Sequence, residues 1–352
     1  MTIQDAQNKI LAVFNNNKTP VNITGVNVSN FSIIFELEPL QGVTVSKIKR
    51  LLPDLSIYVK NPTIEVNNGL FLKIDNTFSQ RQFYDFVKYA EQDTTKKIPL
   101  YFGITEDNKK LVVDLAKLPH LLVAGATGSG KSVFMHDCIL SLLNLKAVNL
   151  LLIDPKKVEY SKYKNVIGCD VRTEYPHILQ GLQNAVALMY SRYEEMEKKG
   201  IVDGHCYYMP YIVIIDELAD LMLNKAIKKD VEMFICRLAQ MGRACNIHLI
   251  IATQRPSVNV LTGLIKANIP CRVAFTCASA IDSRCIIDRK GAETLTGCGD
   301  GLLMQADGKT FTRFQAYSVD ENTFRNYHLT YNRPTQTKQK RAGLFKRLFC
   351  IA

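Results

Sequence analysis

The sequence predicts an α/β protein whose main part is a mostly parallel sheet, preceded by a small α+β domain. The first observation is an alternation of helical patterns with short apolar runs that have the length of buried strands. Strands that alternate with helices form a parallel sheet with helices on both faces. The second observation is a glycine-rich segment, 125–130, that joins the first run to a helix. The apolar runs lie at 121–124, 149–153, 211–215, 247–252 and 272–277.

The first 95 residues follow a different pattern from the rest of the chain. Short apolar runs there indicate strands, and apolar residues on one side of a segment indicate a helix. The pattern predicts a helix, a strand, a helix and two further strands, at 1–20, 31–37, 45–52, 55–60 and 69–74. A charged, polar stretch at 91–97 then serves as a linker. We therefore expect three parts: an α+β domain over 1–95, the sheet domain over 96–330 and a basic tail over 331–352.

Residues 125–132 read Gly-Ala-Thr-Gly-Ser-Gly-Lys-Ser, which matches the phosphate-binding loop G-x-x-x-x-G-K-[ST]. An apolar strand pattern precedes this loop and a helical pattern follows it, so a glycine-rich turn without a ligand is disfavoured. The glycines let backbone N–H groups surround phosphate oxygens, and the helix N-terminus adds partial positive charge. We expect Lys131 to contact the β- and γ-phosphates of ATP and Ser132 to bind Mg²⁺. The predicted ATP-binding residues are Gly125, Ala126, Thr127, Gly128, Ser129, Gly130, Lys131, Ser132 and Val133.

Two adjacent acids, Asp216 and Glu217, follow the apolar run at 211–215. In P-loop proteins the first acid of such a pair orients Mg²⁺, and the second polarises the attacking water as general base. We assign Asp216 to the metal and Glu217 to the water. The alternative is an acidic helix N-cap, because carboxylates are favoured at a helix start in any case.

A third signal lies at the end of the run 247–252, where Thr253 and Gln254 follow an apolar strand pattern. A polar side chain at this strand end is suited to sense the γ-phosphate. Three cations, Arg255, Lys266 and Arg272, lie on or beside the next loops. The alternative for each of them is a solvated loop cation.

The composition bounds the class of protein. The chain has 352 residues, 47% of them hydrophobic, and a formal net charge of +11. This hydrophobic content excludes a disordered protein, and the basic balance favours a polyanionic partner. The ten cysteines include no C-x-x-C pair and no metal-ligand spacing, so we expect free thiols, no haem and no structural metal. No signal peptide and no membrane-spanning run are visible, so we expect a cytoplasmic protein.

The last residues carry a marked excess of positive charge, because no acid follows Glu321. If 338–349 is helical, its cations gather near one face and its apolar residues elsewhere. Three interpretations stay open: a solvated tail, loose contacts with DNA phosphates, and docking on a membrane or a protein partner.

The sequence contains six further runs besides the phosphate loop: Asp154-Pro-Lys, Asp216-Glu-Leu-Ala-Asp-Leu-Met, Arg237-Leu-Ala-Gln-Met-Gly-Arg-Ala, the stretch from Thr253-Gln-Arg-Pro-Ser-Val to Pro270, Ser279-Ala-Ile-Asp-Ser-Arg and Asp288-Arg-Lys-Gly-Ala-Glu. Together they resemble the FtsK/SpoIIIE family of DNA translocases, most specifically over 119–300. The segment 1–95 resembles the family's α subdomain, and 100–320 resembles its RecA-like β subdomain.

The resemblance implies a hexameric ring that grips double-stranded DNA in its central channel and moves it by hydrolysis of ATP with Mg²⁺. It implies that Arg243 is an arginine finger that reaches a neighbouring subunit's γ-phosphate, and that Gln254 is a sensor. Arg255 and Lys266 match positions on channel loops that touch the DNA backbone. The alternative for Arg243 is an ion pair with an acid on a helix surface.

The chain also departs from the family pattern. Ala280 stands where the family often has a lysine, and neither a membrane-spanning region nor a winged-helix module is present in the sequence. Sequence-directed loading is therefore not expected, and a minimal motor of this kind suits a phage, a plasmid or an integrative element. Two other functions stay open: a secretion or coupling ATPase that moves protein or nucleoprotein, and a non-motor scaffold that binds ATP to assemble.

Overall fold

The computed structural model describes residues 2–76, 82–90, 95–145 and 147–320. The chain forms two compact units, one made of the residues up to 83 with 104–109, the other of 84–103 with the residues from 110 onward. The predicted basic tail, 331–352, lies outside the described residues. None of the helices in the described ranges combines the length and the apolar character that a membrane crossing demands.

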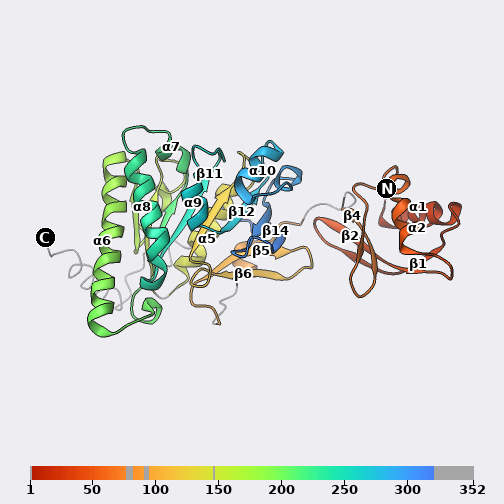
Figure 1. Ribbon diagram of the computed structural model, residues 1–352, viewed down its shortest axis with the longest axis horizontal. Coiled ribbons are helices and arrows are strands. Elements are labelled where there is room, and N and C mark those ends of the chain that lie inside the picture. Colours follow the sequence, from red (N-terminus) through yellow and green to blue (C-terminus); the bar gives the residue numbers. More distant parts are fainter. Residues whose placement is uncertain (1, 77–81, 91–94, 146, 321–352) are drawn as a thin grey trace. The chain divides into compact units, whose positions relative to one another are not determined.

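The first unit is a four-stranded antiparallel sheet with three helices (Figure 1). Apolar side chains of its strands and helices form one core, centred on Ile33, Phe35 and Leu72. The α1 helix begins with a capping box, in which Thr2 and Asp5 each accept a hydrogen bond from the other's backbone N–H. The elements are α1 (Ile3–Asn16), β1 (Val21–Val28), β2 (Ser32–Pro39), α2 (Val45–Arg50), α3 (Leu52–Leu55), β3 (Thr63–Val66) and β4 (Leu70–Asp75), with strand order β1-β2-β4-β3.

The predicted strand at 55–60 is wrong. Leu55, Ile57 and Val59 alternate in the sequence, but only Leu55 and Val59 are buried, whereas Ile57 is 75% exposed. The short α3 helix, with Pro53 in its first turn, ends at Leu55, and hydrogen-bonded turns follow it in place of a strand. The pattern also gave no warning of β1 and β3, whose side chains are mostly exposed.

The second unit carries the predicted mostly parallel sheet, which is confirmed. In the described residues the sheet has ten strands in the order β6-β5-β14-β13-β12-β7-β11-β10-β8-β9, and those from β12 to β9 run parallel. The strands are β5 (Pro99–Thr105), β6 (Lys110–Asp114), β7 (His120–Ala124), β8 (Asn149–Ile153), β9 (Cys169–Arg172), β10 (Tyr211–Ile215), β11 (Ile247–Thr253), β12 (Cys271–Phe275), β13 (Asp300–Met304) and β14 (Phe311–Ala316).

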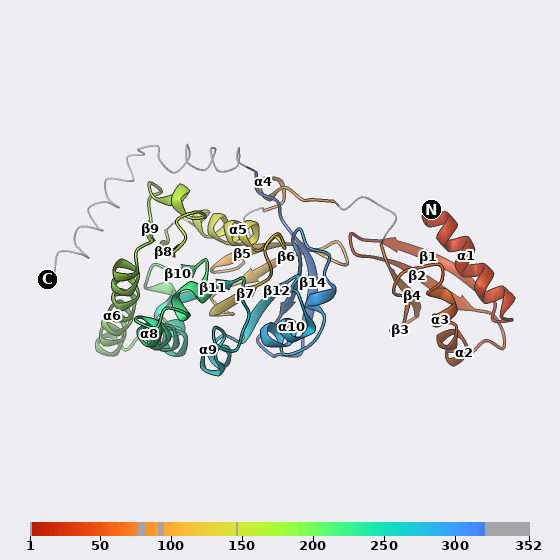
Figure 2. The ribbon, with the colours of Figure 1, turned by 90° about the horizontal axis from the view of Figure 1, so that it is seen from above.

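Helices cover both faces of this sheet, with α5 on one side and α6, α8 and α9 on the other (Figure 2). Consecutive residues of a strand enter opposite cores: Leu121 and Val123 pack with α5, and Leu122 packs with α6 and α8. The helices are α4 (Phe86–Tyr89), α5 (Lys131–Leu143), α6 (Tyr175–Lys199), α7 (Leu218–Met222), α8 (Lys228–Met241), α9 (Gly263–Asn268) and α10 (Ala280–Ile287), with short 3₁₀ turns η1 (Ser161–Tyr163), η2 (Gly204–Cys206), η3 (Gly242–Cys245) and η4 (Ala292–Thr294).

One polar side chain lies inside the α5 core. Asp137 is fully buried, and its two carboxylate oxygens have no hydrogen-bond partner among the described residues. Burial raises the pKa of Asp137 well above its ordinary value. The folded state therefore binds this proton more tightly than the unfolded chain, so the contribution to stability falls as the pH rises above about 4.

We expect Asp137→Asn to be more stable than the wild type at pH 7, because the wild-type carboxyl group must take up a proton on folding at that pH, whereas the amide is neutral in both states. The gain shrinks as the pH falls towards about 4, where the wild-type group becomes protonated in both states. Thermal unfolding of both proteins at several pH values measures the difference. The exposed Glu197→Gln on α6 is the matched control, and an Asp137→Asn gain that does not vary with pH would contradict the assignment.

Candidate nucleotide site

The phosphate loop joins the end of β7 to the start of α5, as predicted. Gly130 caps α5 in a left-handed conformation with φ 101°, and a Cβ there would lie 2.3 Å from the backbone nitrogen of Gly299. That same nitrogen donates a hydrogen bond of 2.8 Å to the carbonyl of Ser129. Gly128, with φ 77°, has nothing within 4 Å of its Cβ position. The loop is thus braced on one side by the segment before β13 and open on the side of Gly128.

Lys131 and Asp216 lie together, although 84 residues separate them in the sequence. The Lys131 Nζ is 3.6 Å from Asp216 Oδ1 and donates a hydrogen bond of 3.2 Å to the Asp216 carbonyl. Both side chains are almost fully buried. Burial raises the pKa of Asp216, and the neighbouring Lys131 ammonium opposes that rise. The ammonium and the carboxylate therefore compensate each other in a site largely shielded from water.

Glu217 has contacts on every side. Its Oε1 accepts hydrogen bonds from Thr253 Oγ1 at 2.7 Å and from the backbone N–H of Ala219 at 3.2 Å. The backbone N–H of Gln254 lies 3.2 and 3.1 Å from its two oxygens, and the Lys156 ammonium lies 3.6 Å from Oε2. The contact with Ala219 makes Glu217 the N-cap of α7, so the alternative weighed for this residue is also realised.

Gln254 reaches the phosphate loop with its side chain. Its Oε1 accepts a hydrogen bond of 3.1 Å from Thr127 Oγ1. The strand end that carries Gln254 and the loop that carries Thr127 are neighbours, because β11 pairs with β7. A side chain at this position is placed to respond to what the loop binds.

Ser132, at the first turn of α5, lies beside a polar cluster. The carboxylate of Glu159 belongs to this cluster and contacts the His136 ring at 3.2 Å. The hydrogen bond from His136 lowers the pKa of Glu159 to about 2. His136 in turn contacts the Tyr163 hydroxyl at 3.0 Å. A carboxylate from the loop after β8 therefore forms part of the polar surroundings of α5.

The residues present fit a magnesium ion. Asp216 Oδ1 and Asp154 Oδ1 are buried acceptor oxygens without a hydrogen-bond partner among the described residues, and Ser132 offers a hydroxyl nearby in the motif. Mg²⁺ prefers such oxygen ligands, and it is usually bound by one or two side chains together with water and phosphate oxygens. The described part of the chain contains no cluster of three or more His, Cys, Asp or Glu side chains that could hold a metal ion.

Arg243 lies at the opposite edge of the sheet from the phosphate loop. It belongs to η3, which precedes β11, whereas the loop follows the carboxyl end of the parallel neighbour β7. The seven residues of β11 span roughly 20 Å, so Arg243 cannot reach the loop of its own chain.

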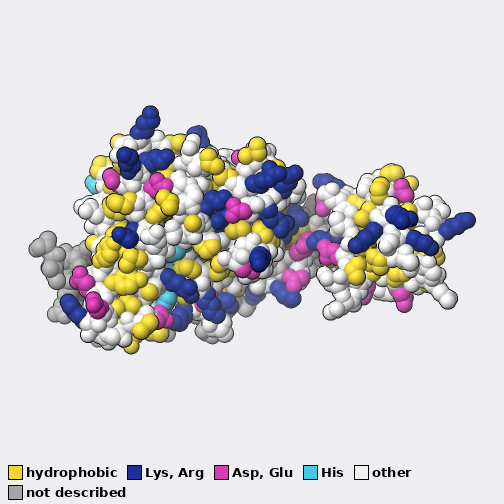
Figure 3. All heavy atoms as spheres, viewed as in Figure 1, with side chains coloured by type: hydrophobic (Ala, Val, Ile, Leu, Met, Phe, Trp, Pro, Cys, Tyr) yellow, Lys and Arg dark blue, Asp and Glu magenta, His cyan; other side chains and the backbone are white. Residues whose placement is uncertain are grey.

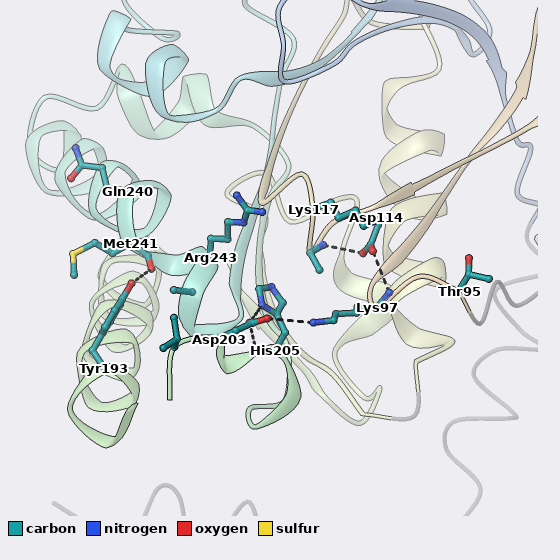
Figure 4. Close-up of a pocket in the computed structure, with 13 residues that line it drawn as sticks. Thr95, Lys97, Asp114, Lys117, Tyr193, Asp203, His205, Gln240, Met241 and Arg243 are labelled. Carbon is teal, nitrogen blue, oxygen red and sulfur yellow. Dashed lines mark hydrogen bonds and ion pairs between the residues drawn. The ribbon is translucent and has the colours of Figure 1, made fainter. Parts of the chain in front are cut away.

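Arg243 lines a pocket of about 600 Å³ (Figure 4). Lys97 and Asp203 form an ion pair of 3.4 Å in its wall, and Lys117 lies on the same lining. No acid among the described residues pairs with Arg243 or Lys117, and both side chains are exposed. The ion pair with a surface acid, which was the alternative for Arg243, is therefore not formed within the described residues.

The two predicted DNA contacts differ in their surroundings. Arg255 is exposed, and no acid among the described residues pairs with it. Lys266 is 21% exposed and forms an ion pair of 2.6 Å with Asp288, which also pairs with Arg272. Lys and Arg side chains gather on the surface over α10 (Figure 3). Arg255 is free to meet a phosphate, whereas Lys266 must leave or share its acid.

The sequence does not predict the contacts of three residues of this region: Thr253 with Glu217, Lys156 with Glu217, and Lys117 in the pocket that Arg243 lines. Lys156 belongs to the run Asp154-Pro-Lys, which carries part of the family resemblance but predicts no contact for the lysine. A polar residue at the end of a buried strand was the one signal for Thr253. Lys117 carried no signal, since an exposed lysine before a strand is ordinary.

A sequence model of the FtsK/SpoIIIE family matches residues 85–210 and 203–258. The DNA translocase FtsK of Caldanaerobacter subterraneus subsp. tengcongensis is 40% identical over 309 residues, which is 82% of this chain and 43% of that protein. The DNA translocase SftA of Bacillus subtilis is 40% identical over 312 residues, which is 82% of this chain and 33% of that protein. The chain thus spans less than half the length of these two relatives.

Solved structures share the fold at lower identity. The pCW3 conjugation coupling protein TcpA, in its monomer form with ATPγS, aligns with a TM-score of 0.68 over 92% of this chain and 98% of its own, at 22% identity. The cytoplasmic domain of the type VII secretion ATPase EccC from Thermomonospora curvata aligns with a TM-score of 0.58 over 68% of this chain and 32% of its own, at 21% identity. These similarities support the α/β fold.

We expect Lys131→Ala to lower the affinity for a fluorescent ATP analogue by at least about tenfold, because a charge-assisted contact with phosphate is lost and Asp216 is left buried without its cation. Fluorescence titration in the presence of Mg²⁺ measures the affinity. Lys164→Ala removes an exposed lysine elsewhere on the same unit and serves as the control. Equal affinities of Lys131→Ala and wild type would remove Lys131 from the nucleotide site.

Proposed function

We propose a function from one premise: the chain belongs to the FtsK/SpoIIIE family. The function is ATP hydrolysis coupled to the movement of double-stranded DNA, carried out in the cytoplasm by a ring of identical subunits. Relatives named DNA translocase support the cargo, and the phosphate loop supports ATP as the fuel. A role in the transfer, segregation or packaging of phage or mobile-element DNA suits this function.

One observation carries the proposal. Lys131 and the adjacent pair Asp216-Glu217 come from two distant segments of the chain, yet all three lie at the carboxyl edge of the parallel sheet, next to the loop with the open Gly128. Ligands of open α/β sheets bind outside the carboxyl ends of the strands. The Glu217 carboxylate caps α7 and, at this edge of the sheet, also offers a base for the hydrolysis of ATP.

Each residue has one task in the proposed hydrolysis. The loop N–H groups and Lys131 bind the phosphates and neutralise their charge. Ser132 and Asp216 would bind Mg²⁺, which when bound draws electron density from the phosphate oxygens. Glu217 accepts the proton of the attacking water, and Gln254, through its contact with Thr127, senses the occupant of the loop.

The active site is completed by a second subunit in this proposal. Arg243 lies too far from its own phosphate loop, and its pocket presents two cations that have no acid among the described residues. A neighbouring subunit's γ-phosphate would meet this need, as an arginine finger supplied in trans does in other NTPases. A closed ring, for which we propose six subunits, gives every site such a neighbour.

ATP turnover with and without duplex DNA, together with displacement of a triplex-forming strand from linear duplex, tests the function. We expect duplex DNA to stimulate turnover and ATP to drive displacement, with Glu217→Gln as the variant that binds ATP without hydrolysing it. Stimulation by a protein partner alone would instead indicate a secretion or coupling ATPase. An absence of turnover in every condition would indicate a scaffold.

We expect Arg243→Ala to bind ATP with normal affinity but to hydrolyse it at least about 100-fold more slowly, as the loss of an arginine finger does. Mixing Arg243→Ala with Lys131→Ala subunits should restore part of the turnover, because one intact loop then meets one intact finger. Turnover is measured across mixing ratios, with subunit exchange verified by labelled subunits. Mixed rings without any recovery would contradict a role in trans.

We expect Arg255→Ala to weaken binding of unrelated duplexes by a similar factor and to reduce the slope of log affinity against log salt by about one unit, as the loss of one phosphate contact does. Asp288→Asn should strengthen binding, because it releases Lys266 and Arg272 from their shared acid and keeps a residue suited to the left-handed conformation, φ 58°. Fluorescence anisotropy over a salt series measures both. A loss confined to one sequence would refute backbone contact.

A further inference from the structure

The contacts of Glu217 leave it little capacity to act as a base. Two of the hydrogen bonds to Oε1 come from Thr253 and Ala219, and Gln254 N–H lies between both oxygens. The Lys156 ammonium occupies the remaining side at 3.6 Å from Oε2. A carboxylate has about four lone-pair directions, and here protein donors meet nearly all of them. A water that is to lose its proton to Glu217 must first displace one of these donors.

The shortest of these contacts belongs to a chain of hydrogen bonds that leads to the proposed DNA contact. The backbone N–H of Arg255 donates to Thr253 Oγ1 at 3.1 Å, and the same hydroxyl donates to Glu217 at 2.7 Å. Thr253 is fully buried, whereas Arg255, two residues further on, is exposed. Hydrogen bonds in such a chain strengthen one another, and a shift at one end weakens the whole.

We propose that Thr253 is a positioning residue that keeps Glu217 in a resting position, and that a DNA phosphate bound by Arg255 releases it. The proposal rests on the proposed function, since it assumes that Glu217 is the base and that DNA meets Arg255. Displacement of the Arg255 backbone breaks the 3.1 Å bond, turns the Thr253 hydroxyl away, and frees Oε1 for the water. Gln254, between the two, moves with them and loosens its contact with Thr127.

This restraint on Glu217 explains why three consecutive residues at the end of β11 make polar contacts or meet the surface. Thr253, Gln254 and Arg255 face the base, the phosphate loop and the surface in turn. A motor that hydrolysed ATP without cargo would waste it, and a base restrained until DNA arrives prevents that loss. Lys156, whose side chain is 41% exposed, adds to the restraint on Glu217 by its positive charge.

The test compares Thr253→Val with Thr253→Ser. Valine has the shape of threonine but lacks the hydroxyl, whereas serine retains it. We expect Thr253→Val to raise ATP turnover without DNA by about tenfold, the effect of losing one hydrogen bond to a charged group, and to reduce the ratio of turnover with and without DNA towards one. Thr253→Ser should restore the low turnover without DNA and the wild-type ratio. Lys156→Met, at a half-exposed position that tolerates change, should also raise turnover without DNA.

Thermal unfolding and ATP-analogue binding identify variants that do not fold. If Thr253→Val does not fold, Lys156→Met alone tests the restraint on Glu217. If Thr253→Val and Lys156→Met lower turnover with and without DNA by the same factor, the contacts support catalysis and the resting-position proposal is overturned. Where duplex DNA stimulates the wild type, an unchanged ratio overturns the proposal as well. The DNA-free turnover tests the restraint by itself, so wild-type protein that duplex DNA fails to stimulate counts against the proposed cargo and not against the restraint on Glu217.

Discussion

The ion pair of Lys131 and Asp216 depends on the register of β7 and β10, whose carboxyl ends lie at the same edge of the sheet. Taking an ammonium and a carboxylate out of water costs several kcal/mol for each ion unless they are paired. The pairing of Ile215 with Ile251, and of Ala124 with Thr253, sets β10, β11 and β7 in that register. A slip of one residue would turn each strand's side chains to the opposite face and separate the two charges. The register and the charge pair therefore support each other.

Sequence patterns predicted the parts of this molecule that are strongly periodic. The five apolar runs of the sheet domain correspond to β7, β8, β10, β11 and β12, because buried parallel strands need apolar residues on both faces. The alternation at 55–60 failed because the chain there leaves a short helix through hydrogen-bonded turns, which bury Leu55 and Val59 but expose Ile57. The edge strands β1 and β3 escaped because Val21 is the one buried residue among the residues of these two strands.

The candidate site divides in the same way. Lys131, Asp216 and Glu217 were named from motifs, since the chemistry of phosphate and metal demands those residue types in that order. Their partners were not, because a contact such as that of Thr253 with Glu217 depends on the register between two strands that are distant in sequence. The position of Arg243 at the far edge of the sheet likewise follows from strand direction, and it puts the residue out of reach of the phosphate loop of its own chain.

The brace at Gly299 bears on how this domain can be divided. The segment matched by the family ends at residue 258 and already includes the loop, both acids and Arg243. Yet the carbonyl of Ser129 is bonded by a residue that precedes β13, and Ala316 on β14 bonds the carbonyl of Gly299 in turn. A shortened chain would retain its whole catalytic signature and still lack the backbone partner that shapes the loop. The smallest piece of this domain that keeps the shape of the loop therefore extends to its antiparallel strands, far from any motif.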